Sequence, residues 1–384
     1  MSFLIRLSVL SILFFTQNSF SHRGEGDGHE RLSDPARIDQ ALAELDLEHA
    51  PNSTNSLCED VANCLLEKQA VMSELASQMS VVTQYISDLM QDEELKQNQD
   101  QLKELLKQCR NLSTDDQIKE LITKIDNTHW IHGSEDCDVN SDPEIQLERM
   151  GMGLSIMRQN KCLTSEAPFL YVLESPDKVV LVDTGDIYQG SELYEQVRAI
   201  AGDREIEVIH THAHGDHTAG DYSFKDKEDS HLHEASVDTH KELFGIDDWP
   251  NEIGSYDMGD RELQIIPVPG HESSSVAIYD PQSKIMMTGD IMYPGRLYIN
   301  NYPEFLKSLD RLKDFSDKNE VSAYLGGHVE MSNVPKEDIP FGNYAPNERS
   351  LVLRNSDLDE LYEAAYENSE DRNQVKLDQM IIYP

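Results

Sequence analysis

The pattern of apolar positions divides the chain into two parts. Over residues 56–128 apolar side chains recur three and four positions apart, as at Met72, Leu75 and Met79, which is the spacing of one face of an α-helix. The last helix of this part is expected to begin at Ser113, where a hydroxyl residue is followed three positions later by an acid, as in a capping box. We therefore predict a small helical hairpin or bundle over residues 56–128.

From residue 130 to 335 short apolar runs bounded by Pro, Gly or Asp alternate with helical patterns. Strands are predicted over 169–173, 179–182, 207–210, 263–268, 276–279 and 284–288, and helices over 192–200, 233–243 and 302–315. Such an alternation is typical of an α/β domain in which helices cover layered sheets. Residues 336–384 form a C-terminal extension, with a predicted helix over 356–366 and a last strand at 381–383.

The first 21 residues have the features of a secretory signal peptide. Arg6 precedes an apolar run over 7–15, and small residues surround Phe20 before His22. The run is too short to cross a bilayer core, which needs about 20 residues. We therefore expect an exported protein, periplasmic or secreted, with no stable membrane anchor, whose residues 22–55 form a flexible acidic lead-in.

The net charge limits the classes of partner that the protein can bind, and the cysteines bear on its redox compartment. Acidic residues outnumber basic ones by 72 to 32, a net charge of −40 that argues against nucleic-acid partners and disfavours polyanionic substrates. The five cysteines are an odd number, so at least one lacks a partner within the chain. Because disulfides persist after export, we expect at least one, between Cys109 and either Cys58 or Cys64.

The helical module over 56–128 has two interpretations. It could mediate a homodimer or dock a partner, or it could pack on the catalytic domain of its own chain. Met-containing apolar stripes at helical spacing are more often core than binding site, which favours the second interpretation.

The strongest chemical signal follows the predicted strand at 207–210. His212, His214, Asp216 and His217 lie within six residues, so that a strand end and the turn at Gly215 can direct all four side chains to one place. His271, Asp290 and His328 each follow a glycine and come at or soon after an apolar segment. Each of these three is a weak signal alone, but together they favour a common metal site.

These residues, with Asp183 in the segment Leu-Val-Asp-Thr-Gly, resemble the metallo-β-lactamase superfamily motif by motif over roughly residues 150–335. The resemblance implies a four-layer αβ/βα sandwich with two metal ions at the sheet edge, zinc in our interpretation, with iron or manganese as alternatives. It also implies the distribution of ligands: one metal is expected on His212, His214 and His271, the other on Asp216, His217 and His328, with Asp290 between the two. Asp183 is expected to orient the histidine loop without binding metal.

A hydroxide shared by two metals would then attack a small ester, lactone, thioester or phosphodiester. True β-lactamases of this superfamily generally carry cysteine or serine at the position of Asp290, so the resemblance is closer to the glyoxalase II and lactonase branches. β-Lactam hydrolysis stays as an alternative activity. Another alternative is a binding or scaffold protein that acts through its helical module and keeps a vestigial metal site, but all seven ligands are present.

Six residues in or near these motifs receive further predicted roles. Asp216 is expected to take part in the reaction as well as in metal binding. Tyr293, three residues past Asp290, is expected to donate a hydrogen bond to the substrate, with packing as the alternative. Arg296 is predicted either to bind a substrate carboxylate or to neutralise this acidic chain. His210 is expected to be buried and hydrogen-bonded, and His231 and His233 to have structural or exposed roles.

Overall fold

The computed structural model describes residues 114–187, 191–259 and 261–384, and its contacts divide the chain into two units, Met1–Thr114 and Asp115–Pro384. The expected signal peptide, the acidic lead-in and all but the last helix of the predicted helical module lie outside the described residues. The predicted pairing of Cys109 with Cys58 or Cys64 lies outside them as well. The last helix is α6 (Thr114–Asn127), which begins directly after the predicted cap Ser113. Among the described helices, none combines the length and the apolar composition needed to cross a membrane.

The first sheet has six strands in the order of the sequence, from β1 to β6. Strands β1 to β4 are antiparallel neighbours, whereas β4, β5 and β6 run parallel to one another. Its strands are β1 (Ile145–Gly151), β2 (Leu154–Gln159), β3 (Phe169–Glu174), β4 (Lys178–Val182), β5 (Glu205–Ile209) and β6 (Ser230–Leu232).

The second sheet also has six strands, in the order β13-β12-β10-β9-β8-β7. Strands β10 and β12 are parallel, and the other neighbours are antiparallel. Its strands are β7 (Gly254–Asp257), β8 (Glu262–Pro267), β9 (Val276–Asp280), β10 (Ile285–Gly289), β12 (Ala323–Gly326) and β13 (Val352–Leu353).

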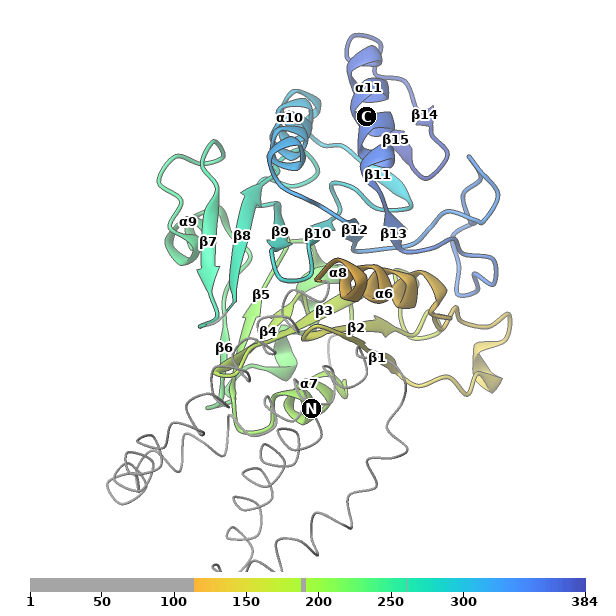
Figure 1. The fold of residues 1–384 in the computed structure, drawn as a ribbon. Coiled ribbons are helices and arrows are strands. Elements are labelled where there is room, and N and C mark those ends of the chain that lie inside the picture. The colour runs from red at the N-terminus through yellow and green to blue at the C-terminus, as the bar shows by residue number, and fades with distance from the viewer. Residues whose placement is uncertain (1–113, 188–190, 260) are drawn as a thin grey trace, which may run out of the picture. The chain divides into compact units, whose positions relative to one another are not determined.

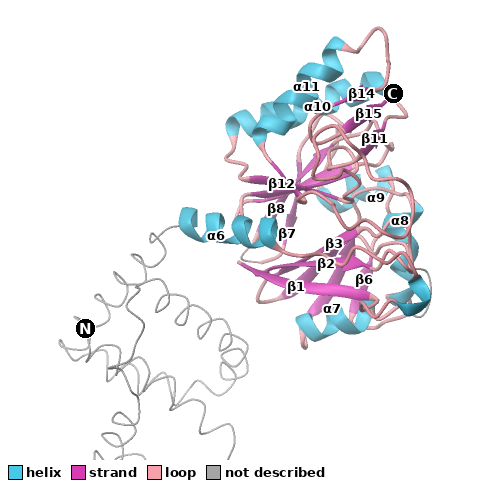
Figure 2. Ribbon diagram, turned by 90° about the vertical axis from the view of Figure 1, so that its right-hand side faces the viewer, coloured by secondary structure: helices cyan, strands magenta, loops and turns pink. Residues whose placement is uncertain are grey.

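The two sheets pack face to face, and helices cover their outer faces (Figure 1). The central core joins side chains such as Leu173 and Val180 of the first sheet to Ile265 and Ile278 of the second. A second apolar cluster lies under α7 (Leu193–Ala201) on the first sheet, and a third lies under α10 (Tyr302–Lys318) and α11 (Asn355–Glu367) on the second. This arrangement of layers, visible edge-on in Figure 2, confirms the predicted αβ/βα sandwich.

Helix α6 contributes apolar side chains to the central core, among them Leu121 and Ile125. The sequence had assigned this segment to the helical module that ends at residue 128, whereas it packs with the two sheets. The other predicted domain boundaries stay predictions.

The C-terminal residues beyond 335 join the same body. Strand β15 (Ile381–Tyr383) pairs in parallel with β11 (Arg296–Tyr298) and antiparallel with β14 (Val375–Lys376), which forms a small third sheet. Helix α11 and β15 confirm the helix and the last strand predicted in this region.

One predicted helix begins later than expected. The helix expected over 233–243 is α9 (Val237–Phe244), because Ser236 takes the cap position and its hydroxyl accepts a hydrogen bond from the amide of Thr239. His233 instead extends the pairing of β6, where its amide donates to the carbonyl of Val208. The remaining short helices are η2 (Cys137–Val139), α8 (Gly215–Thr218) and η3 (Ala219–Ser223).

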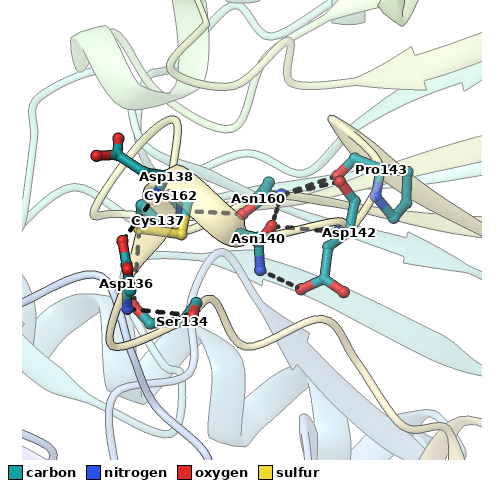
Figure 3. Close-up of a disulfide and its surroundings, with 9 residues drawn as sticks. All are labelled: Ser134, Asp136, Cys137, Asp138, Asn140, Asp142, Pro143, Asn160 and Cys162. Carbon is teal, nitrogen blue, oxygen red and sulfur yellow. Dashed lines mark hydrogen bonds between the residues drawn. A yellow bond between two sulfur atoms is a disulfide. The ribbon is translucent and has the colours of Figure 1, made fainter.

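A disulfide joins Cys137 in η2 to Cys162 in the loop after β2 (Figure 3). This pairing was not predicted from the sequence. Beside it the side-chain amide of Asn160 donates to the side-chain oxygen of Asn140 and to the carbonyl of Pro143. The bridge and these hydrogen bonds hold the start of the loop that leads to β3, and that loop reaches the site described next.

Candidate metal centre

The predicted site residues follow five strands whose ends meet at one edge of the sandwich. In the first sheet, Asp183 follows β4 and the histidine block follows its parallel neighbour β5. In the second sheet, His271 comes after β8, Asp290 comes directly after β10, and His328 comes after β12. The fold therefore brings together residues that are far apart in the sequence.

The histidine block has the local structure that its spacing predicts. His214 lies on extended backbone and immediately precedes the short helix α8. The turn of α8 begins at Gly215 and carries Asp216 and His217 around to the same side. Four donor side chains are thus presented from one short segment.

The seven predicted ligands form two groups, and within each group the donor atoms lie within 4.8 Å of one another. In the first group His214 Nδ1 lies 3.2 Å from His212 Nε2 and 2.9 Å from His271 Nε2. The second group consists of Asp216, His217, Asp290 and His328. The structure therefore brings together every residue that the sequence predicted as a ligand.

Asp290 lies between the two groups. Its Oδ2 is 3.7 Å from His271 Nε2 and 3.6 Å from His328 Nε2, and its Oδ1 is 3.3 Å from His217 Nε2. The side chain is buried, and Oδ1 makes no hydrogen bond. A buried carboxylate oxygen without a hydrogen bond is costly, and a cation beside it would remove that cost.

Three histidines are anchored through the nitrogen that faces away from the centre. The Nδ1 atom of His271 donates to the carbonyl of Tyr298 over 2.7 Å, and that of His328 donates to the carbonyl of Glu166 over 3.2 Å. The Nδ1 atom of His217 donates to Asp183 Oδ2 over 2.8 Å. Because carbonyl and carboxylate oxygens only accept, each neutral imidazole carries its proton on Nδ1 and directs the lone pair of Nε2 inward.

His212 is anchored in the same way, through the hydroxyl of Thr211. The hydroxyl of Thr211 donates to Asp183 Oδ2 over 2.7 Å, so it accepts from His212 Nδ1 at 3.1 Å. Asp183 also accepts from the amide of Thr211 over 2.7 Å. Asp183 therefore holds His217 directly and His212 through Thr211, which is the geometry expected of a residue that orients the histidine loop.

Converging lone pairs and a buried carboxylate suit cations, and the donor types fit zinc, iron or manganese. The pKa values agree with this fit. Burial and the nearby His217 lower the pKa of His212 well below its usual value, so its imidazole stays neutral. Burial raises the pKa of Asp290, but the charges of His328 and His217 outweigh burial and bring the pKa below its usual value. The carboxylate of Asp290 therefore stays ionised.

Other histidines of the centre retain a proton when no cation competes for it. Burial lowers the pKa of His217, yet the Asp290 and Asp183 carboxylates outweigh that effect and raise it well above its usual value. Likewise Asp290 and Asp216 raise the pKa of His328 to about 9 against the effect of burial. Cation binding at these nitrogens would therefore release protons.

Two glycines leave room for this arrangement. A Cβ atom at Gly327 would lie 2.6 Å from Asp290 Oδ1 and 2.7 Å from His217 Cε1. Gly270 has φ of +150°, and a Cβ atom there would lie 2.7 Å from the Cα atom of Phe305. Larger residues would displace Asp290 at the first position and the turn that carries His271 at the second.

Tyr293 is buried, and its ring packs edge-on against His328 at 5.5 Å between ring centres. Its hydroxyl donates to the carbonyl of Arg296 and lies 3.3 Å from Glu330 Oε2. Proximity to the centre was predicted correctly. The hydroxyl, however, already has protein partners, which favours the packing interpretation over a hydrogen bond to substrate.

Arg296 is 3% exposed and has its own partners. Its guanidinium donates to Glu330 over 3.0 Å, to Asp338 over 3.0 Å and to the carbonyl of Ile339. Nothing in this geometry supports the predicted contact with a substrate carboxylate. The structure instead shows the alternative, an arginine that neutralises acidic groups of its own chain.

His210 is buried as predicted, but neither ring nitrogen makes the predicted hydrogen bond; Nε2 lies 3.2 Å from Asp221 Oδ1 and Nδ1 lies 3.7 Å from Asp183 Oδ1. Sequence reasoning missed Thr211 and the carbonyls of Glu166 and Tyr298. Thr211 stands inside the histidine block and could have been noticed as a hydroxyl between two ligands. The carbonyls have no side-chain signal in the sequence.

Comparisons with known proteins agree with this geometry. Residues 166–328 match the family model described as the metallo-beta-lactamase superfamily. The chain is 32% identical over 78 residues to the acyl-coenzyme A thioesterase MBLAC2 of Gallus gallus. This alignment covers 19% of this chain and 28% of that protein. The chain is also 26% identical over 159 residues to the hydroxyacylglutathione hydrolase of Methylococcus capsulatus. That alignment covers 41% of this chain and 61% of the relative.

The aligned part thus spans less than two thirds of either relative. Among solved structures, TMB-1 matches 60% of this chain and 100% of its own, at 18% identity and a TM-score of 0.43. Both sequence relatives are named hydrolases or thioesterases, in agreement with the predicted position outside the true β-lactamases. The part of the chain over residues 166–328 therefore matches the metallo-beta-lactamase superfamily, and the two sequence relatives are named as hydrolytic enzymes.

Proposed function

We propose that this chain is an exported hydrolase that binds two zinc ions and cleaves a thioester of a small thiol. The position of Asp290 carries the proposal. Its carboxylate is buried between two groups of converging donors and has an oxygen without a hydrogen bond. One cation would satisfy one group only, whereas a carboxylate between the groups balances two dications.

The chain's residues would divide the work between binding and orientation. One zinc would be held by His212, His214 and His271, and the other by Asp216, His217 and His328, with Asp290 shared. Bound zinc would lower the pKa of a water molecule and polarise the acyl carbonyl. The anchors on the outer nitrogens fix the ring orientations beforehand, so little reorganisation is needed when substrate binds.

Asp216 is the carboxylate best placed to move a proton. Its side chain is 23% exposed, whereas that of Asp290 is 7% exposed. Asp216 Oδ2 lies 3.1 Å from His328 Nε2, which fixes the carboxylate at the centre. A proton taken up by Asp216 can therefore pass to solvent or to the departing sulfur.

The substrate class follows from the relatives and from charge. Proteins named acyl-coenzyme A thioesterase and hydroxyacylglutathione hydrolase both act on acyl groups carried by a thiol. In the proposed reaction the oxygen of water bonds to the acyl carbon, the carbon–sulfur bond breaks, and the sulfur leaves as a thiol after it gains a proton. A net charge of −40 disfavours a polyphosphorylated thiol, so we expect a small carrier.

The test is a substrate panel on zinc-reconstituted protein. It contains an acyl-coenzyme A, an acylglutathione, an acyl thioester of N-acetylcysteamine, a homoserine lactone, a phosphodiester and a β-lactam. We expect the two thioesters of smaller thiols to have the highest kcat/KM. A lactone, phosphodiester or β-lactam as the best substrate would overturn the thioester assignment, and acyl-coenzyme A as the best would overturn the charge argument.

Export is supported by the signal-like residues 1–21 and by the disulfide between Cys137 and Cys162, which suits an oxidising compartment. Expression of the full chain in a host with a secretion pathway, followed by mass spectrometry of the recovered protein, tests it. We expect a mature chain that begins near His22 with Cys137 and Cys162 oxidised. An unprocessed chain in the cytoplasm would contradict export.

A further inference from the structure

A second group of metal-binding side chains lies on strands β5 and β6, apart from the centre described above. Donor atoms of Glu205, Glu207 and His231 lie within 4.8 Å of one another. Glu207 precedes His212 by five residues, a distance of about 16 Å along an extended chain. The group therefore does not share ligands with the metal centre.

Strand pairing explains why these three side chains converge. β5 and β6 are parallel, and Glu207 pairs with His231 in their register. Glu205 is two residues before Glu207, so both carboxylates project from the same face of β5. The group is thus set by the register of two paired strands, with β6 at the edge of the sheet.

The central carboxylate is held in place by its own partners. Glu207 is 8% exposed, and its Oε2 lies 2.8 Å from His233 Nε2. An oriented carboxylate is therefore present between the exposed side chains of Glu205 and His231.

The local charge favours a cation, with one opposing group. Two carboxylates face Lys178, whose Nζ lies 4.0 Å from Glu207 Oε1. The ammonium reduces the negative potential but does not cancel it. An imidazole with two carboxylates is a donor set that suits zinc, with water completing four-coordination.

We propose that Glu205, Glu207 and His231 bind a zinc ion at the edge of the first sheet, separate from the metal centre. His233 positions Glu207 and is not itself a required ligand. The site is open to solvent on the Glu205 and His231 sides, so it exchanges its ion more readily than the buried centre.

The experiment compares zinc binding by the full chain and by its variants. Metal-depleted protein is dialysed against increasing free zinc, and the bound zinc is measured by elemental analysis. The double variant Glu205→Gln/His231→Asn should bind one zinc fewer per chain than wild type at micromolar free zinc. Both substitutions are at exposed side chains, so folding and the hydrolysis of the best substrate should be unchanged.

Two single variants sharpen the test. His129→Asn removes an exposed histidine that belongs to none of the ligand groups found among the described residues, and it should bind as much zinc as wild type. Lys178→Gln removes the opposing charge, and it should bind the surface zinc several-fold more tightly. Stronger binding after loss of a cation would not follow from a purely structural role of Lys178.

The difference in bound zinc per chain between wild type and the double variant tests the surface site independently of the metal centre. Equal zinc contents over the whole titration would overturn the proposal, as would a difference that appears only at millimolar zinc. Failure of the metal centre would instead lower the zinc content and the activity of all four proteins together.

Discussion

Two loops reach the same edge of the sandwich, one after β5 and one after β10, and both carry polar residues at suggestive spacing. After β5, His212 and His217 are anchored on the outside and direct lone pairs inward. After β10, the hydroxyl of Tyr293 and the guanidinium of Arg296 already have protein partners. The difference teaches that closeness to a centre is not enough, because a functional group must also have an atom left for the ligand.

Asp290→Asn should have the largest effect of the changes that test this comparison. An amide is neutral and one of its two positions donates, so it balances two dications poorly. We expect the zinc content of the centre to fall below two per chain and kcat/KM to fall by about a hundredfold or more. Elemental analysis and steady-state kinetics on one preparation measure both, and full occupancy with unchanged rate would refute the role given to Asp290.

Asp183→Asn tests the orientation of the histidine loop. In Asp183 both oxygens accept, Oδ2 from the Thr211 hydroxyl and His217 and Oδ1 from the Thr211 amide. The NH2 group of an asparagine cannot accept at either position, so one set of these bonds is lost and the histidine loop loses its fixed direction. Zinc affinity or kcat/KM should fall about 10- to 100-fold, as is usual for partners of metal-bound histidines. Asp221→Asn, which changes a carboxylate near His210 but outside these hydrogen bonds to His217, is the control and should lose less.

Arg296→Gln tests the loop after β10, whose polar groups already have protein partners. Glu330 and Asp338, whose side chains are 13% and 25% exposed, would lose their cation. The free energy of unfolding should fall by about 2–3 kcal/mol, somewhat less than for a fully buried pair. Urea denaturation measures this, and KM for the best substrate should be unchanged. A rise in KM of tenfold or more with little loss of stability would restore the predicted substrate contact.

Tyr293→Phe should have the smallest effect. The ring keeps its packing against His328, and only the hydrogen bond to the Arg296 carbonyl is lost, which costs about 1 kcal/mol of stability. We expect kcat within about threefold of wild type with full zinc occupancy, since no transition-state donor is lost. A fall in kcat of tenfold or more would instead support the catalytic role that the sequence suggested.

Much of the sandwich could be predicted because its central strands are apolar on both faces. β10 is buried along its whole length, and β3 is buried except at its last residue. The strands that escaped prediction include β1, β2, β7, β11, β12, β13 and β14. Polar residues interrupt the apolar pattern of β1 and β7, β2 carries polar residues although it is buried throughout, and β12 has only four residues. The pairing of β15 with β11 joins positions far apart in the chain, and no local pattern encodes it.

The convergence of the seven candidate ligands could be predicted because they are the residue types that metal binding requires. The anchors of the histidines could not, since the carbonyls of Glu166 and Tyr298 carry no residue preference. The same limit explains Tyr293 and Arg296, whose partners come from residues 330 and 338 on a distant segment. The sequence suggested their location, whereas the structure supplied the partners that decide their role.

The central claim is that two cations lie on either side of Asp290. Anomalous X-ray scattering at the zinc edge, from crystals of the zinc-reconstituted Glu205→Gln/His231→Asn variant, tests it most directly because the proposed surface site is removed. The account predicts two peaks, one among His212, His214 and His271 and one among Asp216, His217 and His328, with Asp290 between them. A single peak, or none, at full zinc saturation would contradict it.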